Sequence, residues 1–362
     1  MKTPDNNLLR IGIPKEIKPL EGRVGLIPEA CADFVSAGHE VFIQQGAGEA
    51  SGYSDASYQR LGVKILPDAA SLYAQAQLIV KVKEPYGAEP GMLREDHLLF
   101  CFLHLAADPE LTQQLLKSGV TALAFETLAD HTGLPILAPM SDIAGRLAVQ
   151  MGANLLYRPA GGKGLLLGGL PAAQRGRVVV LGAGQAGSNA VRMATSMVAE
   201  VTVFDRQRER MGRMRELGGN VTALYPYRES LVTAVAQADL LIGAVLVPGA
   251  RTPKLVSREL VGSMGDGSVI VDISVDQGGC VETTRPTTYA SPTYVEEGVI
   301  HFAVTNMPGA VPRSASQTLS AALIPYLRIL TSANWHEDPR LATAVNLSKG
   351  QLVYPALREQ YL

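Results

Sequence analysis

A glycine-rich turn between an apolar strand and a helix constrains the fold of this sequence more than any other feature. Gly182, Gly184 and Gly187 form the pattern G-x-G-x-x-G directly after the predicted strand Arg177–Leu181. In such a turn the first glycine allows the tight bend, the second lets the backbone approach a pyrophosphate, and the third lets helix and strand pack. The N–H groups at the start of the helix then face the phosphates. The pattern predicts a dinucleotide-binding site; the alternative is a glycine turn without a ligand.

Asp205 follows the next predicted strand, Val201–Phe204. A carboxylate at this position accepts hydrogen bonds from the ribose hydroxyls of the adenosine and repels a 2′-phosphate. Arg206, Arg208 and Arg210 come directly afterwards. An arginine in this region is how NADP-using enzymes hold the phosphate, whereas the other interpretation is a solvated first helical turn. Because a carboxylate and a phosphate repel each other, the sequence predicts NAD in preference to NADP.

Short apolar, β-branched runs alternate twice with segments of helical period, which is typical of β-α units around a parallel sheet. In the first half we predict strands at Leu9–Ile13, Glu40–Gln44, Val63–Leu66, Gln77–Val82, Leu98–Leu103 and Val120–Phe125. In the second half we predict them at Arg177–Leu181, Val201–Phe204, Val221–Leu224, Leu240–Ala244, Val269–Ile273 and Val299–Ala303. The sequence therefore predicts an α/β fold with two sheets.

The predicted helices fill the gaps between these strands and mark a division of the chain. A continuous helical pattern between Pro139 and Tyr157 is long enough to link two domains. Another helix runs from Pro109 to Lys117 and ends at Gly119. The last apolar helix, about 316–330, has no sheet partner of its own and is expected to pack on the first domain. Further helices are predicted to begin near Pro28, Ala186, Gln207, Tyr227 and Ser257.

Composition excludes several classes of protein. With 47% hydrophobic and 18% charged residues and a net charge of −2, the chain can bury a large core and shows no basic footprint for nucleic acid. Small molecules are the expected partners.

The apolar stretch 97–107 is too short to span a membrane, and residues 1–10 lack the apolar region of a signal peptide, so we expect a cytoplasmic protein. The widely spaced Cys31, Cys101 and Cys280 indicate neither a disulfide framework nor a metal cluster, and we expect no metal.

Polar residues at the carboxyl ends of predicted strands are the candidates for chemistry, because ligands of open parallel sheets bind there. Lys83 can hold a carbonyl, although Lys81 lies on the same face two residues earlier and competes for this role. His104 can move a proton close to physiological pH, or it can be a hydrogen-bonded structural histidine.

Two further residues carry the same ambiguity. Asp276 can orient a cation or simply cap a turn. Arg23 can clamp a carboxylate with two parallel hydrogen bonds or be an ordinary surface arginine.

The sequence resembles the alanine dehydrogenase/NAD(P) transhydrogenase family over nearly its whole length, and within it the alanine dehydrogenases. The resemblance rests on the segments GIPKEIKPLEGRVGLIP, HEVFIQQGAGEASGYSD, LIVKVKEP, LLFCFLHLA, LAPMSDIAGRLAVQMGA, DLLIGAVLVPGARTPKLV, VIVDISVDQGGCVETTRPTT and TNMPGAVPRS. It implies an NAD-dependent oxidative deamination of L-alanine to pyruvate and ammonium, and the reverse reaction. It also implies a homohexamer of chains with two Rossmann-like domains, mostly parallel sheets and an active site in the interdomain cleft.

The resemblance also assigns roles to individual positions. It implies that Arg23 and Lys83 bind the substrate and that His104 and Asp276 are catalytic. It implies that 1–137 and 313–362 form the substrate domain and that 138–312 bind NAD. The positions that match cofactor-binding segments are Ser141, Gly182, Gly184, Gly187, Asp205, Val245, Leu246, Asn306 and Met307.

One departure and two alternatives remain. After Tyr225 the family usually has a serine on the adenosine side, whereas this chain has Pro226 and Tyr227. The first alternative is the nucleotide-binding component of a proton-translocating transhydrogenase. Asp276 argues against it, because the resemblance implies that this relative lacks the aspartate. The second is a catalytically silent NAD-binding sensor, against which the intact Lys83 and His104 argue.

Overall fold

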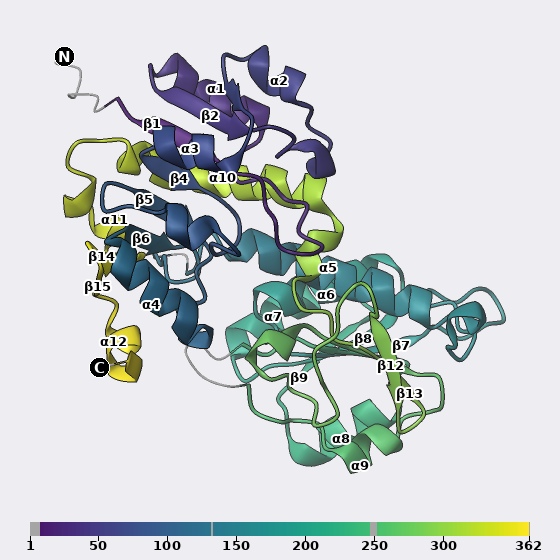
Figure 1. Cartoon of the computed structure of the whole chain (residues 1–362). Helices are drawn as coiled ribbons and strands as arrows, with labels where there is room; N and C mark the ends of the chain where they lie inside the picture. The colour runs from purple at the N-terminus through teal and green to yellow at the C-terminus, as the bar shows by residue number, and fades with distance from the viewer. Residues whose placement is uncertain (1–7, 132, 247–251, 362) are drawn as a thin grey trace. The chain divides into compact units, whose positions relative to one another are not determined.

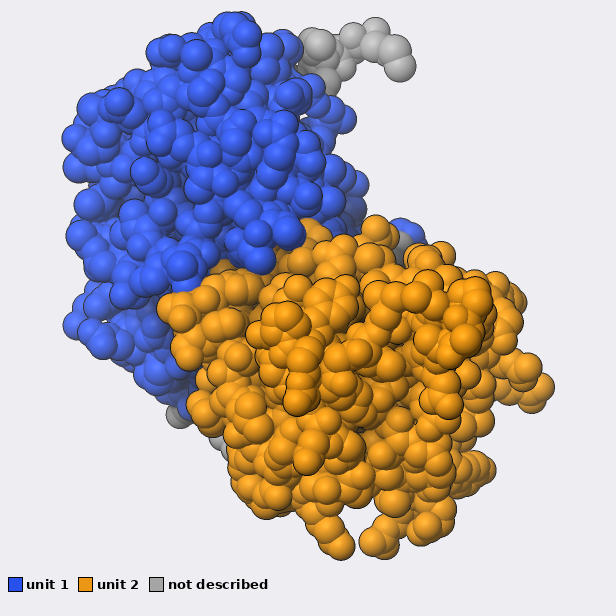
Figure 2. Space-filling model, turned by 90° about the vertical axis from the view of Figure 1, so that its right-hand side faces the viewer, with its two compact units in different colours: residues 1–140, 309–362 blue, residues 141–308 orange. Residues whose placement is uncertain are grey.

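The computed structural model describes residues 8–131, 133–246 and 252–361 (Figure 1). The chain divides into two units, which Figure 2 distinguishes by colour. Unit 1 comprises Met1–Met140 and Gly309–Leu362, and unit 2 comprises Ser141–Pro308. Residues 1–7, on which the expected location partly rests, and 247–251 of one family-like segment lie outside the described residues.

The sheet of unit 1 is mostly parallel, as predicted. Within the described residues it has eight strands in the order β15-β14-β6-β5-β4-β1-β2-β3. The six predicted strands are confirmed and pair in parallel, whereas β14 and β15 are antiparallel additions that the sequence did not predict. The strands are β1 Arg10–Ile13, β2 Glu40–Gln44, β3 Lys64–Leu66, β4 Leu78–Val80, β5 Leu98–Cys101, β6 Thr121–Ala124, β14 Val345–Ser348 and β15 Gln351–Leu352.

The helices of unit 1 come from both ends of the chain. They are α1 Pro28–Ser36, α2 Asp55–Gln59, α3 Ala69–Gln75, α4 Pro109–Ser118, α10 Pro312–Leu330, α11 Pro339–Ala342, α12 Pro355–Tyr361 and the first turn of α5 Ala138–Leu155. As predicted, α4 begins with a proline and ends at Gly119, whose φ of 74° only glycine adopts easily.

Helix α10 is tied to the N-terminal segment of unit 1. The hydroxyls of Ser316 and Ser320 accept the backbone N–H groups of Val24 and Ile27, each at 3.0 Å. A buried core also joins α3, α4 and α12 to the sheet, and it includes Leu347 of β14. The C-terminal segment therefore completes the hydrogen bonding and the core of unit 1.

Unit 2 holds the second predicted sheet. Within its described residues seven strands run in the order β12-β13-β11-β10-β7-β8-β9, and all pair in parallel except the unpredicted edge strand β12. The strands are β7 Arg177–Leu181, β8 Glu200–Phe204, β9 Val221–Leu224, β10 Leu240–Gly243, β11 Val269–Asp272, β12 Thr293–Glu296 and β13 Val299–Phe302. The helices are the remainder of α5, α6 Gln185–Ser196, α7 Arg208–Arg215, α8 Arg228–Ala236 and α9 Arg258–Gly262. The mostly parallel α/β architecture predicted from the sequence is confirmed.

The structure also bears on membrane-spanning helices and on the three cysteines. No helix in the described part of the chain has the length and apolar character needed to cross a membrane. Cys31, Cys101 and Cys280 are buried, and their thiols are unpaired.

Candidate functional site

The glycine turn of unit 2 has the geometry of a dinucleotide cradle. Gly182 has a φ of +95°, and a Cβ there would lie 2.7 Å from the Ala244 carbonyl oxygen. A Cβ at Gly187 would lie 1.8 Å from the Gly182 carbonyl oxygen, so only glycine lets α6 start this close to β7. At Gly184 a Cβ would meet only the Arg210 Nη1 atom, at 4.0 Å. The middle glycine therefore faces open space, as a turn that receives a pyrophosphate requires.

Asp205 lies directly beside this glycine turn. Its two carboxylate oxygens accept the backbone N–H groups of Ala183 and Gln207, both at 2.8 Å, and the residue is only 9% exposed. Arg210 places Nη1 3.7 Å from the carboxylate, whereas Arg206 is exposed. Each carboxylate oxygen can accept a second hydrogen bond, so the ribose hydroxyls of a nucleotide still find acceptors here.

The remaining cofactor candidates of unit 2 follow neighbouring strands. Val245 and Leu246 follow β10, whereas Asn306 and Met307 follow β13. Because β13, β11, β10 and β7 are adjacent and parallel, these segments share the carboxyl edge of the sheet with the glycine turn. Ser141 lies in α5, where the neighbouring Asp142 accepts hydrogen bonds from Gln185 and Asn189 of α6. These positions thus lie at the carboxyl edge of the sheet of unit 2, and Ser141 lies beside the Asp142 that joins α5 to α6.

Asp276 lies on the same edge, in the short helix η5 (Ile273–Gln277) that follows β11. Its side chain is exposed, and the N-terminal cap of η5 is made by Asp272, which accepts the Ser274 N–H at 3.0 Å. Burial raises the pKa of Asp272, although hydrogen bonds from Thr284 and three backbone N–H groups oppose the shift. The start of η5 is therefore capped by Asp272, which the sequence analysis did not single out.

Tyr225 and Tyr227 occupy the place where the sequence departs from the family pattern. Their rings follow β9, the strand beside β8, and lie 4.8 Å apart with both residues exposed. An exposed aromatic pair thus replaces a small hydroxyl side chain next to the strand that carries Asp205.

In unit 1 the structure separates the two competing lysines. Lys81 is completely buried, and its ammonium pairs with Glu16 at 3.3 Å and Glu89 at 2.9 Å. Burial alone would lower the pKa of Lys81, but the two carboxylates raise it well above its usual value. Lys83 is only partly buried. Lys81 is thus held in a buried ion-pair cluster, and Lys83 is the more accessible of the two lysines.

Glu84 follows Lys83 at the end of β4 and pairs with Lys18. One of its carboxylate oxygens pairs with Lys18, and the other, Oε2, is buried and has no hydrogen-bond partner among the described residues. Burial would raise the pKa of Glu84, but the Lys18 hydrogen bond and the charges of Lys83 and His104 lower it. Lys83 and His104 therefore lie near one carboxylate at the ends of β4 and β5, which are neighbouring strands.

His104 is exposed and has an unusual backbone. Its φ of 50° and ψ of 33° are left-handed, and it precedes the short helix η3 (Leu105–Ala107). The imidazole stacks on Phe102 with ring centroids 5.7 Å apart and an angle of 3° between the planes. The structure shows an exposed imidazole stacked on an aromatic ring, and among the described residues the hydrogen bond that His104 donates comes from its backbone N–H.

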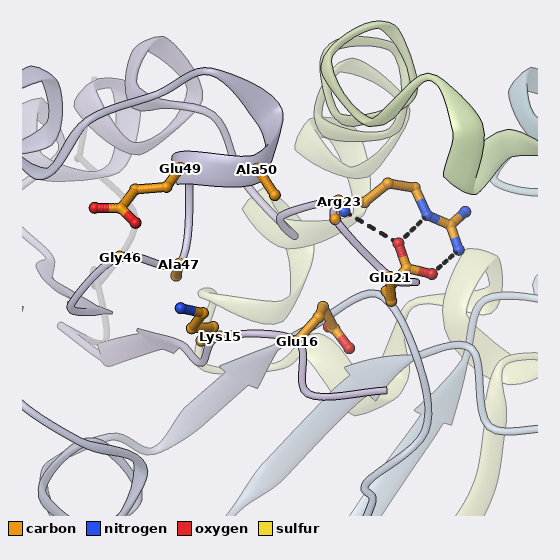
Figure 3. A pocket seen from close by; sticks show the side chains of 9 residues that line it. Lys15, Glu16, Glu21, Arg23, Gly46, Ala47, Glu49 and Ala50 are labelled. Atoms are coloured by element: carbon orange, nitrogen blue, oxygen red, sulfur yellow. Dashed lines mark hydrogen bonds and ion pairs between the residues drawn. The ribbon is translucent and has the colours of Figure 1, made fainter. Parts of the chain in front are cut away.

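Arg23 is not a surface arginine, since only 3% of it is exposed. Its Nε and Nη2 atoms donate to the two oxygens of Glu21 at 2.7 and 2.5 Å, and Nη1 lies 3.2 Å from Met140 Sδ. Figure 3 shows the guanidinium and the Glu21 carboxylate face to face. Glu21 therefore fixes the plane of the guanidinium before any ligand binds.

A cavity of about 130 Å³ lies beside this pair. Its charged lining consists of Lys15, Glu16, Glu21, Arg23 and Glu49, and in Figure 3 the Arg23 guanidinium turns away from Lys15 and Glu49. Glu16, Glu21 and Glu49 thus place three carboxylates in the wall of this cavity, beside the ammonium of Lys15 and the paired Arg23.

The two units together define a class of protein: a two-unit α/β chain with a glycine turn of dinucleotide-binding geometry in one unit and Arg23, Lys83 and His104 in the other. Family models for the alanine dehydrogenase/PNT N-terminal and C-terminal domains match residues 12–144 and 148–355. The chain belongs to the alanine dehydrogenase/PNT family.

Individual relatives agree with this assignment. The chain is 45% identical over 359 residues to an alanine dehydrogenase of Halomonas elongata, with 98% of this chain and 97% of that protein covered. A solved L-alanine dehydrogenase is 48% identical with a TM-score of 0.94, over 97% of this chain and 98% of that one. A transhydrogenase structure from Sinorhizobium meliloti is 25% identical with a TM-score of 0.83, over 96% and 99% of the two chains. The similarity to alanine dehydrogenases is thus the stronger of the two.

Proposed function

We propose that this protein is an NAD-dependent alanine dehydrogenase, which converts L-alanine to pyruvate and ammonium and catalyses the reverse reaction. The observation that carries the proposal is the combination of the dinucleotide cradle with Arg23, Lys83 and His104 in a chain 48% identical to an L-alanine dehydrogenase. Its substrates are then small molecules, in line with the expectation from composition.

Arg23 and Lys83 are the proposed substrate-binding residues. Pyruvate carries a carboxylate beside a ketone, so it needs a fixed cation at one end and a polarising group at the other. Arg23, with its plane held by Glu21, offers directional N–H donors to the carboxylate. Lys83 acts as a point charge near the carbonyl oxygen.

His104 and Asp276 are the proposed catalytic residues. In the deamination direction the imidazole of His104 takes a proton from the water that adds to the iminium carbon and supplies the carbonyl oxygen, as ammonium leaves; in amination it returns the proton and water is released. The carboxylate of Asp276, which is exposed and follows β11, stabilises the positive charge on the substrate nitrogen.

NAD suits the residues of unit 2, because Gly184 faces open space and Asp205 retains acceptor capacity. The predicted cofactor-binding positions that would hold it are Ser141, Gly182, Gly184, Gly187, Asp205, Val245, Leu246, Asn306 and Met307. When bound, NAD⁺ supplies the acceptor for the hydride that leaves the α-carbon of alanine.

Initial rates with a panel of 2-oxo acids, NADH and ammonium test the proposal. We expect pyruvate to be the best substrate, NADH consumption to require ammonium, and NAD⁺ with L-alanine to generate NADH. Hydride exchange between NADH and an NADP analogue in the absence of any amino acid would favour the transhydrogenase component. The similarity to a transhydrogenase structure at 25% identity is the reason for testing this alternative. NADH binding without either activity would indicate the silent sensor.

Replacing Arg23 by lysine should raise the KM for pyruvate about tenfold or more. An ammonium cannot reproduce parallel hydrogen bonds to a carboxylate, and losing one charge-assisted bond costs about 1.5–3 kcal/mol. Steady-state kinetics with varied pyruvate measure the effect.

Arg340 provides a matched control for Arg23. It also pairs through Nε and Nη2 with a carboxylate two residues earlier, Asp338, but its side chain is 59% exposed. Arg340→Lys should leave the KM for pyruvate unchanged. An unchanged KM in Arg23→Lys would remove Arg23 from the substrate site.

The unmodified protein should prefer NAD to NADP about a hundredfold, and Asp205→Ala should narrow the gap. Close to Asp205 the negative 2′-phosphate is repelled by a few kcal/mol at an effective dielectric constant near 20. The sequence order favours Arg206, the neighbour of Asp205, as the arginine that reaches the phosphate after this change, but the structure places Arg210 beside Asp205. Adding Arg210→Ala to Asp205→Ala should therefore abolish the gain, whereas adding Arg206→Ala should preserve it. Equal kcat/KM for NAD and NADP in the unmodified protein would contradict the role of Asp205.

Three wider predictions remain part of this proposal. The substrate domain is assigned to 1–137 and 313–362, and the NAD domain to 138–312. The protein is expected to be a homohexamer in the cytoplasm. Light scattering of the purified protein tests the hexamer directly.

A further inference from the structure

The backbone of His104 needs an explanation, because residues with a Cβ rarely adopt its left-handed conformation. The residue stands just past the end of β5, where the parallel ladder to β6 stops. The register pairs Cys101 with Ala124, and the Phe125 N–H donates to the Cys101 carbonyl oxygen at 2.9 Å. Beyond this point the N–H groups of Leu103 and His104 need another acceptor.

The carboxylate of Glu126 supplies that acceptor. Glu126 follows β6, and its Oε1 accepts the His104 N–H at 2.7 Å. The Leu103 N–H donates to both carboxylate oxygens, at 3.3 and 3.2 Å. A single side chain thus takes the place of the main-chain carbonyl that a longer β6 strand would have offered.

The aromatic support under the imidazole completes the arrangement. The His104 ring stacks on Phe102, and Phe125 meets the Phe102 ring edge-on with centroids 5.1 Å apart. Phe125 itself packs edge-on against Phe100 at 4.6 Å. With Phe102 held in place, the direction of the imidazole depends on the backbone turn that Glu126 secures.

We propose that Glu126 is a positioning residue for His104: its carboxylate holds the 103–104 backbone in the left-handed turn that presents the imidazole to the substrate. The proposal rests on the proposed function, because it assumes that His104 is the acid/base group. The hydrogen bonds that the Glu126 carboxylate accepts in the structure come from the backbone N–H groups of Leu103 and His104, so Glu126 acts through the placement of His104.

Glu126→Ala should lower kcat about a hundredfold, the cost of a misplacement of the order of 1 Å, with the KM for NADH within about twofold. Glu126→Gln keeps one acceptor oxygen and should recover most of the loss, whereas Glu126→Asp withdraws the carboxylate by one methylene and should recover little. Glu110→Ala, an exposed glutamate in the first turn of α4, is the control and should be silent. If Glu126→Ala does not fold, Glu126→Asp decides. Unchanged kcat in a folded Ala or Asp variant would overturn the proposal, and so would a fall in melting temperature with kcat per folded molecule unchanged.

A double-mutant cycle separates this proposal from the proposed function. In the His104→Ala background, Glu126→Ala should lower the residual turnover, measured at high enzyme concentration, less than about threefold. A hundredfold loss in both backgrounds would show that Glu126 acts independently of His104 and would overturn the positioning role while leaving the proposed function intact. Full turnover of His104→Ala would overturn the catalytic role of His104 and with it the positioning role of Glu126, while leaving the proposed reaction intact.

Discussion

Replacing His104 by alanine is expected to lower the turnover number about 10²- to 10⁴-fold and to leave NADH binding within a few-fold of its original strength. Asp276→Ala is expected to behave in the same way. Both side chains are assigned to the chemical step, whereas the nucleotide cradle is built from the glycine turn and Asp205. Steady-state turnover with pyruvate, ammonium and NADH, combined with a fluorescence titration of NADH, separates the two effects.

His336 is the control for this experiment, because it is an exposed histidine with its side chain 62% accessible in the short helix Trp335–Glu337. His336→Ala should have the turnover of the unmodified protein. Near-normal turnover in either His104→Ala or Asp276→Ala would show that the residue concerned has been given the wrong role.

The two lysines of the β4 end should respond in opposite ways to the same substitution. Lys81→Met leaves Glu16 and Glu89 buried without a counter-charge, and breaking a buried ion pair in this way costs about 3–5 kcal/mol of unfolding free energy. Those Lys81→Met molecules that still fold should retain most of the turnover number of the unmodified protein. Lys83→Met should lose turnover and keep its stability. Urea unfolding and steady-state kinetics on both variants provide the comparison.

A second substitution checks the reason for the lost stability. Lys81→Met combined with Glu89→Gln removes one of the orphaned charges, so the double variant should be more stable than Lys81→Met alone. A stable Lys81→Met protein without turnover, beside an active Lys83→Met protein, would reverse the assignment of the two lysines.

Most of the parallel strands could be predicted because they are buried on both faces and therefore form continuous apolar runs, such as residues 178–181, whereas the edge strands β3 and β9 are more exposed. The antiparallel strands β12, β14 and β15 lack this signal. β12 is a half-exposed edge strand, and β14 joins β6 across more than half the chain. Their turns do carry a signal, because Glu297-Gly298 and Lys349-Gly350 have positive φ at both positions, as two-residue hairpin turns require.

The candidate residues could be chosen from the carboxyl ends of the predicted strands, because Lys83, His104 and Asp276 do follow the observed strands β4, β5 and β11. Sequence could not choose between Lys81 and Lys83, because residues two apart on a strand share a face. The choice depends on Glu16, which approaches from the segment after β1.

Glu126 could not be identified from the sequence for a related reason. A glutamate after a strand is usually a solvated residue, and its contact with His104 follows only from the register of β5 against β6. The roles themselves stay predictions that the proposed variants test.

Unit 1 draws on both ends of the chain, and this has a consequence for synthesis on the ribosome. When residues 1–140 have emerged, β6 is still an open edge, because its partner β14 lies at Val345–Ser348. Unit 2 is continuous, so all of its strands emerge before α10 and β14 do. The nascent chain therefore exposes an unpaired, aggregation-prone strand throughout the translation of unit 2, and the last fifty or so residues protect it.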